Sequence, residues 1–167
     1  MHKSFIVALG TIALAGCGEA PAAKQEAAVP AKPVAGTYEV TATVKSLVST
    51  DKSPLPTFAK VGEVTKTVGC VGSDGAPAPE LLAAKGDVCQ VKDPYTRNGR
   101  MNVTLDCRRK GQGQVLAMLD GAYTAEGFTG TVTANSVFTG SGDYKMVQDI
   151  VAKKTADQCT AAAVPKA

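Results

Sequence analysis

The sequence predicts an all-β domain with one short helix, folded as an antiparallel β-sandwich or a small β-barrel of about eight strands. Several segments alternate between apolar and polar residues with a period of two, which is typical of half-buried strands. Clusters of Gly, Pro, Asn, Asp and Ser separate these segments at fairly regular intervals, as turns do in sandwiches and barrels. Only one short stretch carries a helix signature.

The predicted domain begins with two strands. Residues 37–48 alternate strictly, with apolar side chains on one face and polar ones on the other. A loop rich in Ser, Asp and Pro covers residues 49–60, and the second strand covers residues 61–70. A turn cluster over residues 72–77 ends this part of the domain.

The one helix is expected over residues 79–86. Pro79 suits the first turn of a helix, an acidic residue follows it, and Gly86 is a typical terminator. We expect Leu81 and Leu82 to cover an open end of the sheet.

The second half of the domain contains the remaining strands. Residues 114–120 are apolar on both faces, as in a central strand. A turn is expected from Asp93-Pro94 to Asn98-Gly99, and a hairpin is expected about Glu126-Gly127. The predicted strands are residues 87–92, 100–109, 114–120, 121–126, 128–138 and 144–154.

The N-terminal sequence predicts an export signal that ends in a lipidation site. Residues 1–16 have a positive start, an apolar run and small residues before a cysteine. The run is too short to cross a bilayer as a helix. Leu14-Ala15-Gly16-Cys17 resembles the lipobox of bacterial lipoproteins, whose cysteine receives diacylglycerol and often a further acyl chain such as palmitate. Two or more acyl chains give stable membrane attachment. Simple secretion with a free Cys17 is the alternative.

The sequence divides into four parts. After the signal peptide, residues 17–35 hold the lipidated Cys17 and a disordered tether, because they offer too little apolar surface to fold. Residues 36–159 form the disulfide-bonded β domain, and residues 160–167 form a flexible tail. In bacterial lipoproteins, an Asp directly after the lipidated cysteine favours retention at the inner membrane. By this resemblance, Gly18 at that position predicts the outer membrane, facing the periplasm.

The cysteines left after lipidation predict two disulfides. An even number of cysteines in an exported domain is typical of a disulfide framework. Three pairings are open, and we favour 70–89 with 107–159 because each closes a plausible unit. No two cysteines have the spacing of a zinc knuckle, so we expect no metal. The four are Cys70, Cys89, Cys107 and Cys159.

Few catalytic groups are available, and we expect no enzyme and no cofactor. The only histidine, His2, lies in the predicted signal, which excludes His-based triads and His-based metal sites from the mature chain. Paired carboxylates or a Ser-Lys dyad remain as alternatives. The candidate carboxylates Asp74, Asp106, Asp120 and Asp143 sit in turns or on polar strand faces, where solvated charge is the simpler interpretation.

Charge argues against nucleic-acid binding, because the formal net charge is only +3. The arginines are nevertheless concentrated between residues 97 and 109. If the flanking strands pair as a hairpin, they could form a basic patch that contacts an anionic surface or polymer. Solvated faces and edge protection are the simpler interpretation. The arginines are Arg97, Arg100, Arg108 and Arg109.

Loose motifs over residues 36–159 resemble a family of uncharacterised, mostly proteobacterial exported proteins, domain of unknown function number 3617. The chain departs from the family pattern at Tyr38, where Trp is usual, and before Cys159. The family implies no activity. The matching residues are Gly36, Tyr38, Glu39, Cys70, Pro79, Glu80, Leu81, Gly86, Cys89, Cys107, Gly121, Tyr123, Thr124, Phe128, Thr129, Gly130 and Cys159.

Two functional hypotheses follow. The first is a cell-envelope lipoprotein on the periplasmic side of the membrane, a non-enzymatic binding or structural module for an unknown envelope protein or polymer. The second is a carrier that holds a small hydrophobic ligand inside a β-barrel. The volume left unfilled in the core discriminates between them.

Overall fold

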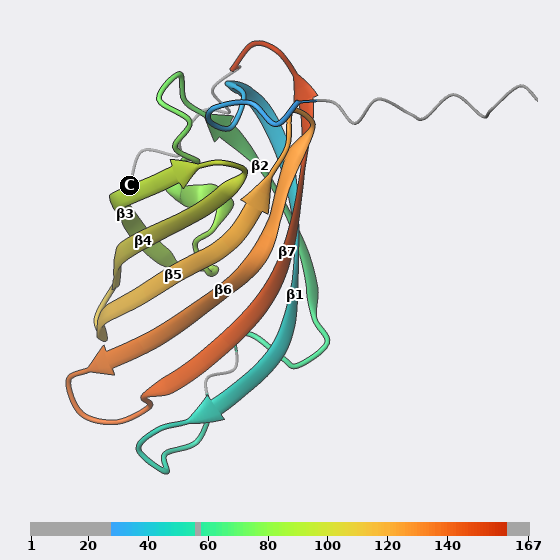
Figure 1. The fold of residues 1–167 in the computed structure, drawn as a ribbon. Coiled ribbons are helices and arrows are strands. Elements are labelled where there is room, and N and C mark those ends of the chain that lie inside the picture. The colour runs from blue at the N-terminus through green and yellow to red at the C-terminus, as the bar shows by residue number, and fades with distance from the viewer. Residues whose placement is uncertain (1–27, 56–57, 160–167) are drawn as a thin grey trace, which may run out of the picture.

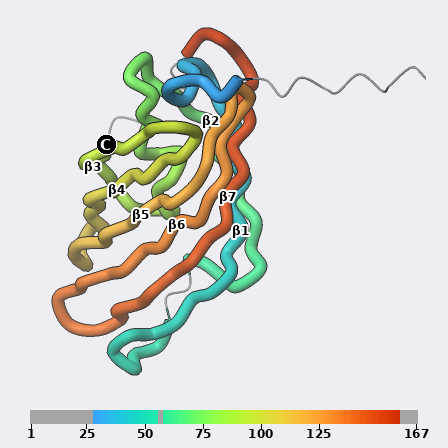
Figure 2. Tube along the Cα trace, in the orientation of Figure 1, coloured from blue at the N-terminus to red at the C-terminus, as the bar shows by residue number. Residues whose placement is uncertain are grey.

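Seven strands form one antiparallel sheet that curls into a half-barrel (Figures 1 and 2). The fold is described by a computed structural model that covers residues 28–55 and 58–159. The strand order in the sheet is β2-β1-β7-β6-β5-β4-β3, so β2 and β3 are the two edges. The elements are β1 (Gly36–Ser49), β2 (Val64–Val71), the 3-10 turn η1 (Pro79–Leu81), β3 (Asp87–Arg97), β4 (Arg100–Arg109), β5 (Gly113–Tyr123), β6 (Gly127–Phe138) and β7 (Tyr144–Ala156).

The predicted all-β antiparallel class is confirmed, but the described residues hold seven strands instead of about eight. Residues 114–120 and 121–126 were expected as two strands, whereas β5 runs unbroken from Gly113 to Tyr123. Gly121 does not break the strand, because it lies opposite Gly130 and lets the two backbones approach closely. The hairpin expected about Glu126-Gly127 joins β5 to β6.

The concave face of the sheet forms the core. Along β4 and β7, every second residue is buried, as the alternating pattern predicts. The largest buried side chains are aromatic or long and apolar, and they come from five strands. They include Tyr38, Met101, Leu105, Leu119, Tyr123, Phe128, Tyr144 and Met146.

Residues 114–120, expected as a central strand, lie in β5 in the interior of the sheet, and the convex face there is open to solvent. Leu116 and Met118 on β5 are 45% and 47% exposed, although β5 is central in the sheet. A single curled sheet buries only its concave face, so an apolar run on both faces does not imply cover on both faces.

The β3–β4 hairpin turns later than expected. β3 continues through Asp93-Pro94, where the register with β4 shifts between Lys92 and Tyr95. A proline is tolerated there because β3 is an edge strand and the register shift relieves the ladder. The turn itself is Asn98-Gly99, whose positive φ angles of 52° and 76° suit a two-residue hairpin loop.

The expected helix over residues 79–86 is reduced to the single 3-10 turn η1. Two consecutive leucines, Leu81 and Leu82, are both buried against the core. η1 ends at Leu81, and its C-cap Leu82 has a φ angle of −120°, so the chain leaves the helical path there instead of continuing to residue 86. η1 contacts both edge strands, β2 and β3, so the two leucines cover the gap between these edges and not an open end of the sheet.

The last part of the predicted tether packs on the domain. Residues 28–35, which we call the strap, cross one end of the half-barrel beside the start of β1 (Figure 2). The hydroxyl of Tyr123 donates to the Ala31 carbonyl at 2.8 Å, and that of Tyr38 donates to the Val34 carbonyl at 2.6 Å. Pro33 is buried. The tether as predicted is therefore too long, and residues 1–27 and 160–167 lie outside the described residues.

Asp51 ties two loops together at the other end. Its carboxylate accepts backbone N–H bonds from Ser53, Gly142 and Asp143. These bonds hold the pKa of Asp51 well below its ordinary value, with the Ser53 bond as the largest cause. Among the residues that the structure describes, no helix is long and apolar enough to cross a membrane.

Candidate functional site: a cavity under the half-barrel

A cavity of about 400 Å³ lies between the concave face of the sheet and the segment that carries η1. Strands β1, β2 and β7 form one wall, and residues 80–87 form the other. The cavity exists because the sheet curls without closing, so that η1 and the residues after it span the gap between β2 and β3.

The inner wall of the cavity is mostly apolar. Short or branched side chains from β1, together with Met146 and Ile150 of β7, leave room below the sheet. The covering segment contributes Leu81, Leu82 and small alanines. The apolar lining residues are Val40, Ala42, Val44, Phe58, Ala59, Leu81, Leu82, Ala83, Ala84, Met146 and Ile150.

Three polar side chains without charge also line the cavity. Thr65 and Thr67 lie on edge strand β2, on the same face as the core residues of β1. Gln148 lies on β7, where it is only 9% exposed. Within the described residues, none of the three side chains makes a hydrogen bond.

The charged residues at the cavity lie at its rim or are paired. Glu63, Glu80 and Lys85 are exposed. Lys66 is also exposed and pairs with Glu39 at 2.9 Å. A wider, shallower hollow lies next to the cavity and shares Phe58, Glu63 and Lys85 with it. We take this hollow as the mouth.

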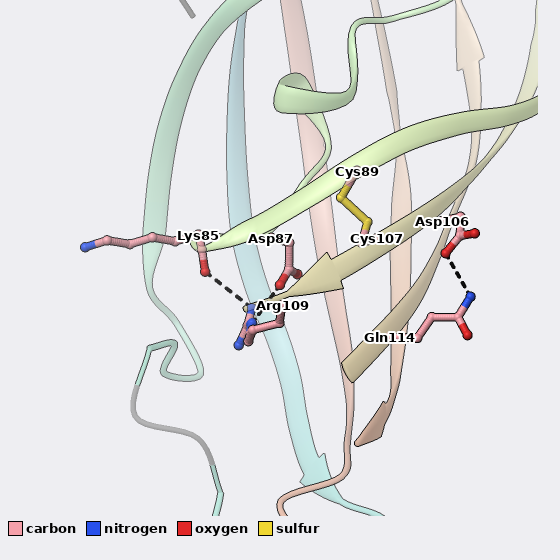
Figure 3. The surroundings of a disulfide bond; sticks show 7 residues. All are labelled: Lys85, Asp87, Cys89, Asp106, Cys107, Arg109 and Gln114. Atoms are coloured by element: carbon pink, nitrogen blue, oxygen red, sulfur yellow. Dashed lines mark hydrogen bonds and ion pairs between the residues drawn. A yellow bond between two sulfur atoms is a disulfide. The ribbon is translucent and has the colours of Figure 1, made fainter. Parts of the chain in front are cut away.

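A buried ion pair lies where residues 80–87, which cover the cavity, meet the start of β3. Arg109 Nε lies 2.6 Å from a carboxylate oxygen of Asp87, and the two side chains are 9% and 1% exposed (Figure 3). Arg109 also donates to the backbone carbonyl of Lys85 at 3.3 Å, while the Lys85 amine points away. Burial raises the pKa of the Asp87 carboxyl, and the guanidinium of Arg109 opposes this rise.

Aromatic rings enclose the same arginine. Its guanidinium carbon lies 3.7 Å from the centre of the Phe58 ring and 5.9 Å from that of Tyr144. Tyr144 also packs edge-on against Phe58 and Phe138. Its hydroxyl is fully buried and has no hydrogen-bond partner in the described chain. Burial raises the pKa of Tyr144 to about 12.

The favoured cysteine pairing is wrong: the disulfides are Cys70–Cys159 and Cys89–Cys107. Cys89 and Cys107 lie directly opposite each other on β3 and β4, with Cα atoms 3.9 Å apart (Figure 3). Cys70 and Cys89 sit on opposite edges of the sheet. Cys159 follows β7, which lies three strand spacings from β4, or about 14 Å at about 4.8 Å each, but only two spacings from β2, the strand of Cys70.

The arginines do not form one patch. Arg97 and Arg100 are opposite each other beside the β3–β4 turn. Arg108 is eight residues further along β4, or about 27 Å away at the rise of a strand. Arg109 points to the concave face and pairs with Asp87. The predicted cluster is therefore split between two ends and two faces of the sheet.

The candidate carboxylates lie apart from the cavity, and three of them have structural contacts. Asp74 accepts a backbone N–H in its turn, and Asp106 accepts the Gln114 amide at 2.8 Å. Asp143 accepts from Ser136 and from the Phe138 backbone. The side chain of Asp120 makes no hydrogen bond or ion pair with the described residues. The described part of the chain contains no group of three His, Cys, Asp or Glu residues that could hold a metal. Cys17 lies outside the described residues.

Sequence reasoning missed the residues that shape the site. Phe58 was assigned to a loop, and the pairing of Asp87 with Arg109 depends on strand register. Gln148 carried a usable signal, because it is the one polar residue in an inward row. That row reads Tyr144, Met146, Gln148, Ile150 and Ala152.

The structure defines an all-β domain that consists of one half-barrel sheet with a cavity beneath it. The chain belongs to the family described as "Protein of unknown function (DUF3617)", whose sequence model matches residues 31–159. The resemblance expected from the motifs is thereby confirmed. Searches of curated proteins and of solved structures each gave no match.

Proposed function

We propose that this protein is a lipid-anchored, non-enzymatic binding module of the cell envelope that holds a small, mostly apolar ligand in its cavity. The observation that carries the proposal is the unfilled volume of about 400 Å³ under the half-barrel. Ligand pockets typically measure about 300–1,000 Å³ and have apolar walls with a few polar groups. A sheet that served only as a structural module could fill this space with larger side chains.

The envelope location is supported by two independent features of the chain. The lipobox-like Leu14-Ala15-Gly16-Cys17 predicts acylation, and the remaining cysteines pair in two disulfides. Disulfides persist in oxidising compartments such as the periplasm. A module tethered there could take a hydrophobic molecule from, or deliver it to, a membrane or an envelope protein.

The ligand is tested by native mass spectrometry of residues 18–167, exported to the periplasm without acyl chains. We expect a reproducible extra mass that disappears on denaturation. Ala42→Leu, which narrows the cavity from β1, should reduce this mass. Ala122→Leu is the matched control, because Ala122 is exposed on the convex side of β5. A bare mass for the unmodified chain would contradict the ligand proposal and direct the search to protein or polymer partners.

The anchor is tested separately. The full chain should partition with the membrane fraction and incorporate labelled palmitate, whereas Cys17→Ala should do neither. Labelled palmitate in Cys17→Ala, or a soluble full chain, would contradict lipidation at this cysteine without bearing on the cavity.

A further inference from the structure

Gln148 is a polar residue in apolar surroundings. Its neighbours along the inward face of β7 are Met146 and Ile150, and its partners across the sheet are Val44 and Val132. Both valines are almost fully buried. The amide atoms of Gln148 are not among the fully buried polar atoms without a partner, so they reach the open space of the cavity.

The described residues offer no hydrogen-bond partner to this amide, and Gln148 faces the cavity. A partner must therefore come from the cavity itself. An amide carries both donors and an acceptor, so it suits an uncharged group such as a hydroxyl, a carbonyl or another amide.

The charges around the cavity limit the ligand further. The buried guanidinium of Arg109 is neutralised by Asp87, and Lys66 is exposed and paired with Glu39. No described cation is therefore both buried and unpaired at the inner wall. A buried carboxylate or phosphate without a paired cation is strongly disfavoured.

We propose that Gln148 is the binding residue for the polar group of the ligand, and that the ligand is a neutral, mostly apolar molecule with a hydrogen-bonding group such as a hydroxyl, ester or amide. This inference rests on the proposed function of the cavity. Thr65 and Thr67 lie two strands away on β2, at the more exposed side of the same cavity. They can bind a second polar group nearer the solvent.

The test uses the exported chain, the neutral dye N-phenyl-naphthylamine and two competitors of equal length, decanol and decanoate. Unmodified protein should bind the dye and release it to decanol more readily than to decanoate. Gln148→Met, which keeps the size of the side chain, should bind decanol about three- to tenfold more weakly, as expected for one neutral hydrogen bond. Gln90→Met, an exposed glutamine on β3, is the matched control and should change nothing.

A second measurement separates binding from structure. Because the variant removes a buried polar group, ligand-free Gln148→Met should unfold at the same urea concentration as the unmodified chain or at a higher one. Equal decanol binding by both proteins would overturn the role of Gln148 and leave the cavity proposal standing. Weaker decanol binding by Gln148→Met together with a lower stability of this variant would also overturn the role of Gln148. If the unmodified chain binds neither the dye nor decanol, the cavity proposal itself is overturned.

Discussion

Tyr144 shows how a single buried group sets the response to alkali. Its ring has partners on two sides, but its hydroxyl has none among the described residues. Ionisation of that hydroxyl is opposed by burial, which raises its pKa to about 12 from 10.0. The stabilisation from the neutral form is complete below pH 10 and is lost as the pH rises toward 12.

We therefore expect Tyr144→Phe to be as stable as the unmodified chain at pH 8, or slightly more stable, because it removes an unsatisfied hydroxyl and keeps the ring. Between pH 10 and 12 the unmodified chain should lose about 2–3 kcal/mol that the variant keeps. Urea unfolding across this pH range measures both effects. Tyr95→Phe, at an exposed tyrosine, should follow the unmodified chain. A variant with the same alkaline loss would contradict the assignment to Tyr144.

A second prediction at the scale of single residues concerns the ion pair between Asp87 and Arg109. Arg109→Met should destabilise the domain by about 3–5 kcal/mol, because it leaves the Asp87 carboxylate buried without a cation. The double variant Asp87→Leu with Arg109→Met should recover most of that loss, since it removes both charges. Arg108→Met, at the exposed neighbour on β4, should change stability by less than about 0.5 kcal/mol. Urea unfolding measures both variants, and an equal loss of stability in Arg108→Met and Arg109→Met would contradict the prediction.

Inward positions of the strands could be predicted from the sequence, because the sheet repeats every two residues. In the strand predicted over residues 100–109, for example, Met101 and Leu105 fall on one face, and both are buried. Gln148 falls on the same inward row as Met146 and Ile150, but alternation alone does not indicate that its amide faces a cavity. Contacts such as that of Arg109 with Asp87 require the register of two strands, which a local pattern does not contain.

At the scale of the elements, glycine and proline misled the sequence interpretation. Pro94 was taken as a turn residue, but an edge strand accepts it at a shift in register. Gly121 was taken as the first residue of a new strand, but it lies within β5 opposite a second glycine. Local propensity cannot separate these cases, because the answer depends on the neighbouring strand. Cysteine pairing failed for the same reason.

The two disulfides should contribute unequally to stability. Cys89–Cys107 links residues 18 apart within one hairpin, whereas Cys70–Cys159 links residues 89 apart and joins β2 to the chain after β7. On the chain-entropy account, replacing both cysteines of a pair by alanine should destabilise the domain by about 3 kcal/mol for 89–107 and about 4–5 kcal/mol for 70–159.

Urea unfolding of the two double variants measures this difference, and a non-reduced peptide map of the unmodified chain provides the control. The map should contain peptides joined 70–159 and 89–107 only. A peptide that joins Cys70 to Cys89 would contradict the pairing, and a larger loss for the 89–107 variant would contradict the account based on loop length.

At the scale of the whole molecule, an open half-barrel must close its two ends and its gap with other segments. η1 and the residues after it span the gap, Asp51 ties the loops at one end, and the strap crosses the other. Composition predicted the strap as tether, because Ala, Pro and Lys bury little apolar surface. Its attachment instead comes from backbone carbonyls, which every sequence carries and no composition reveals.

The strap should therefore contribute to stability through its carbonyls. Replacing residues 29–34 by Gly and Ser at constant length keeps the carbonyls, but it removes the buried ring of Pro33 and loosens the backbone that holds them against Tyr38 and Tyr123. The domain should therefore lose about 2–3 kcal/mol of stability. Urea unfolding measures the loss, and the same replacement over residues 19–24 is the control. A double-mutant cycle separates the two contributions. Tyr38→Phe combined with Tyr123→Phe should lower the free energy of unfolding when the strap is natural, and should change it little when the strap is replaced. An unchanged unfolding midpoint on replacing residues 29–34 would mean that the strap only lies on the domain, and the tether would then extend through residue 35 as its composition predicts.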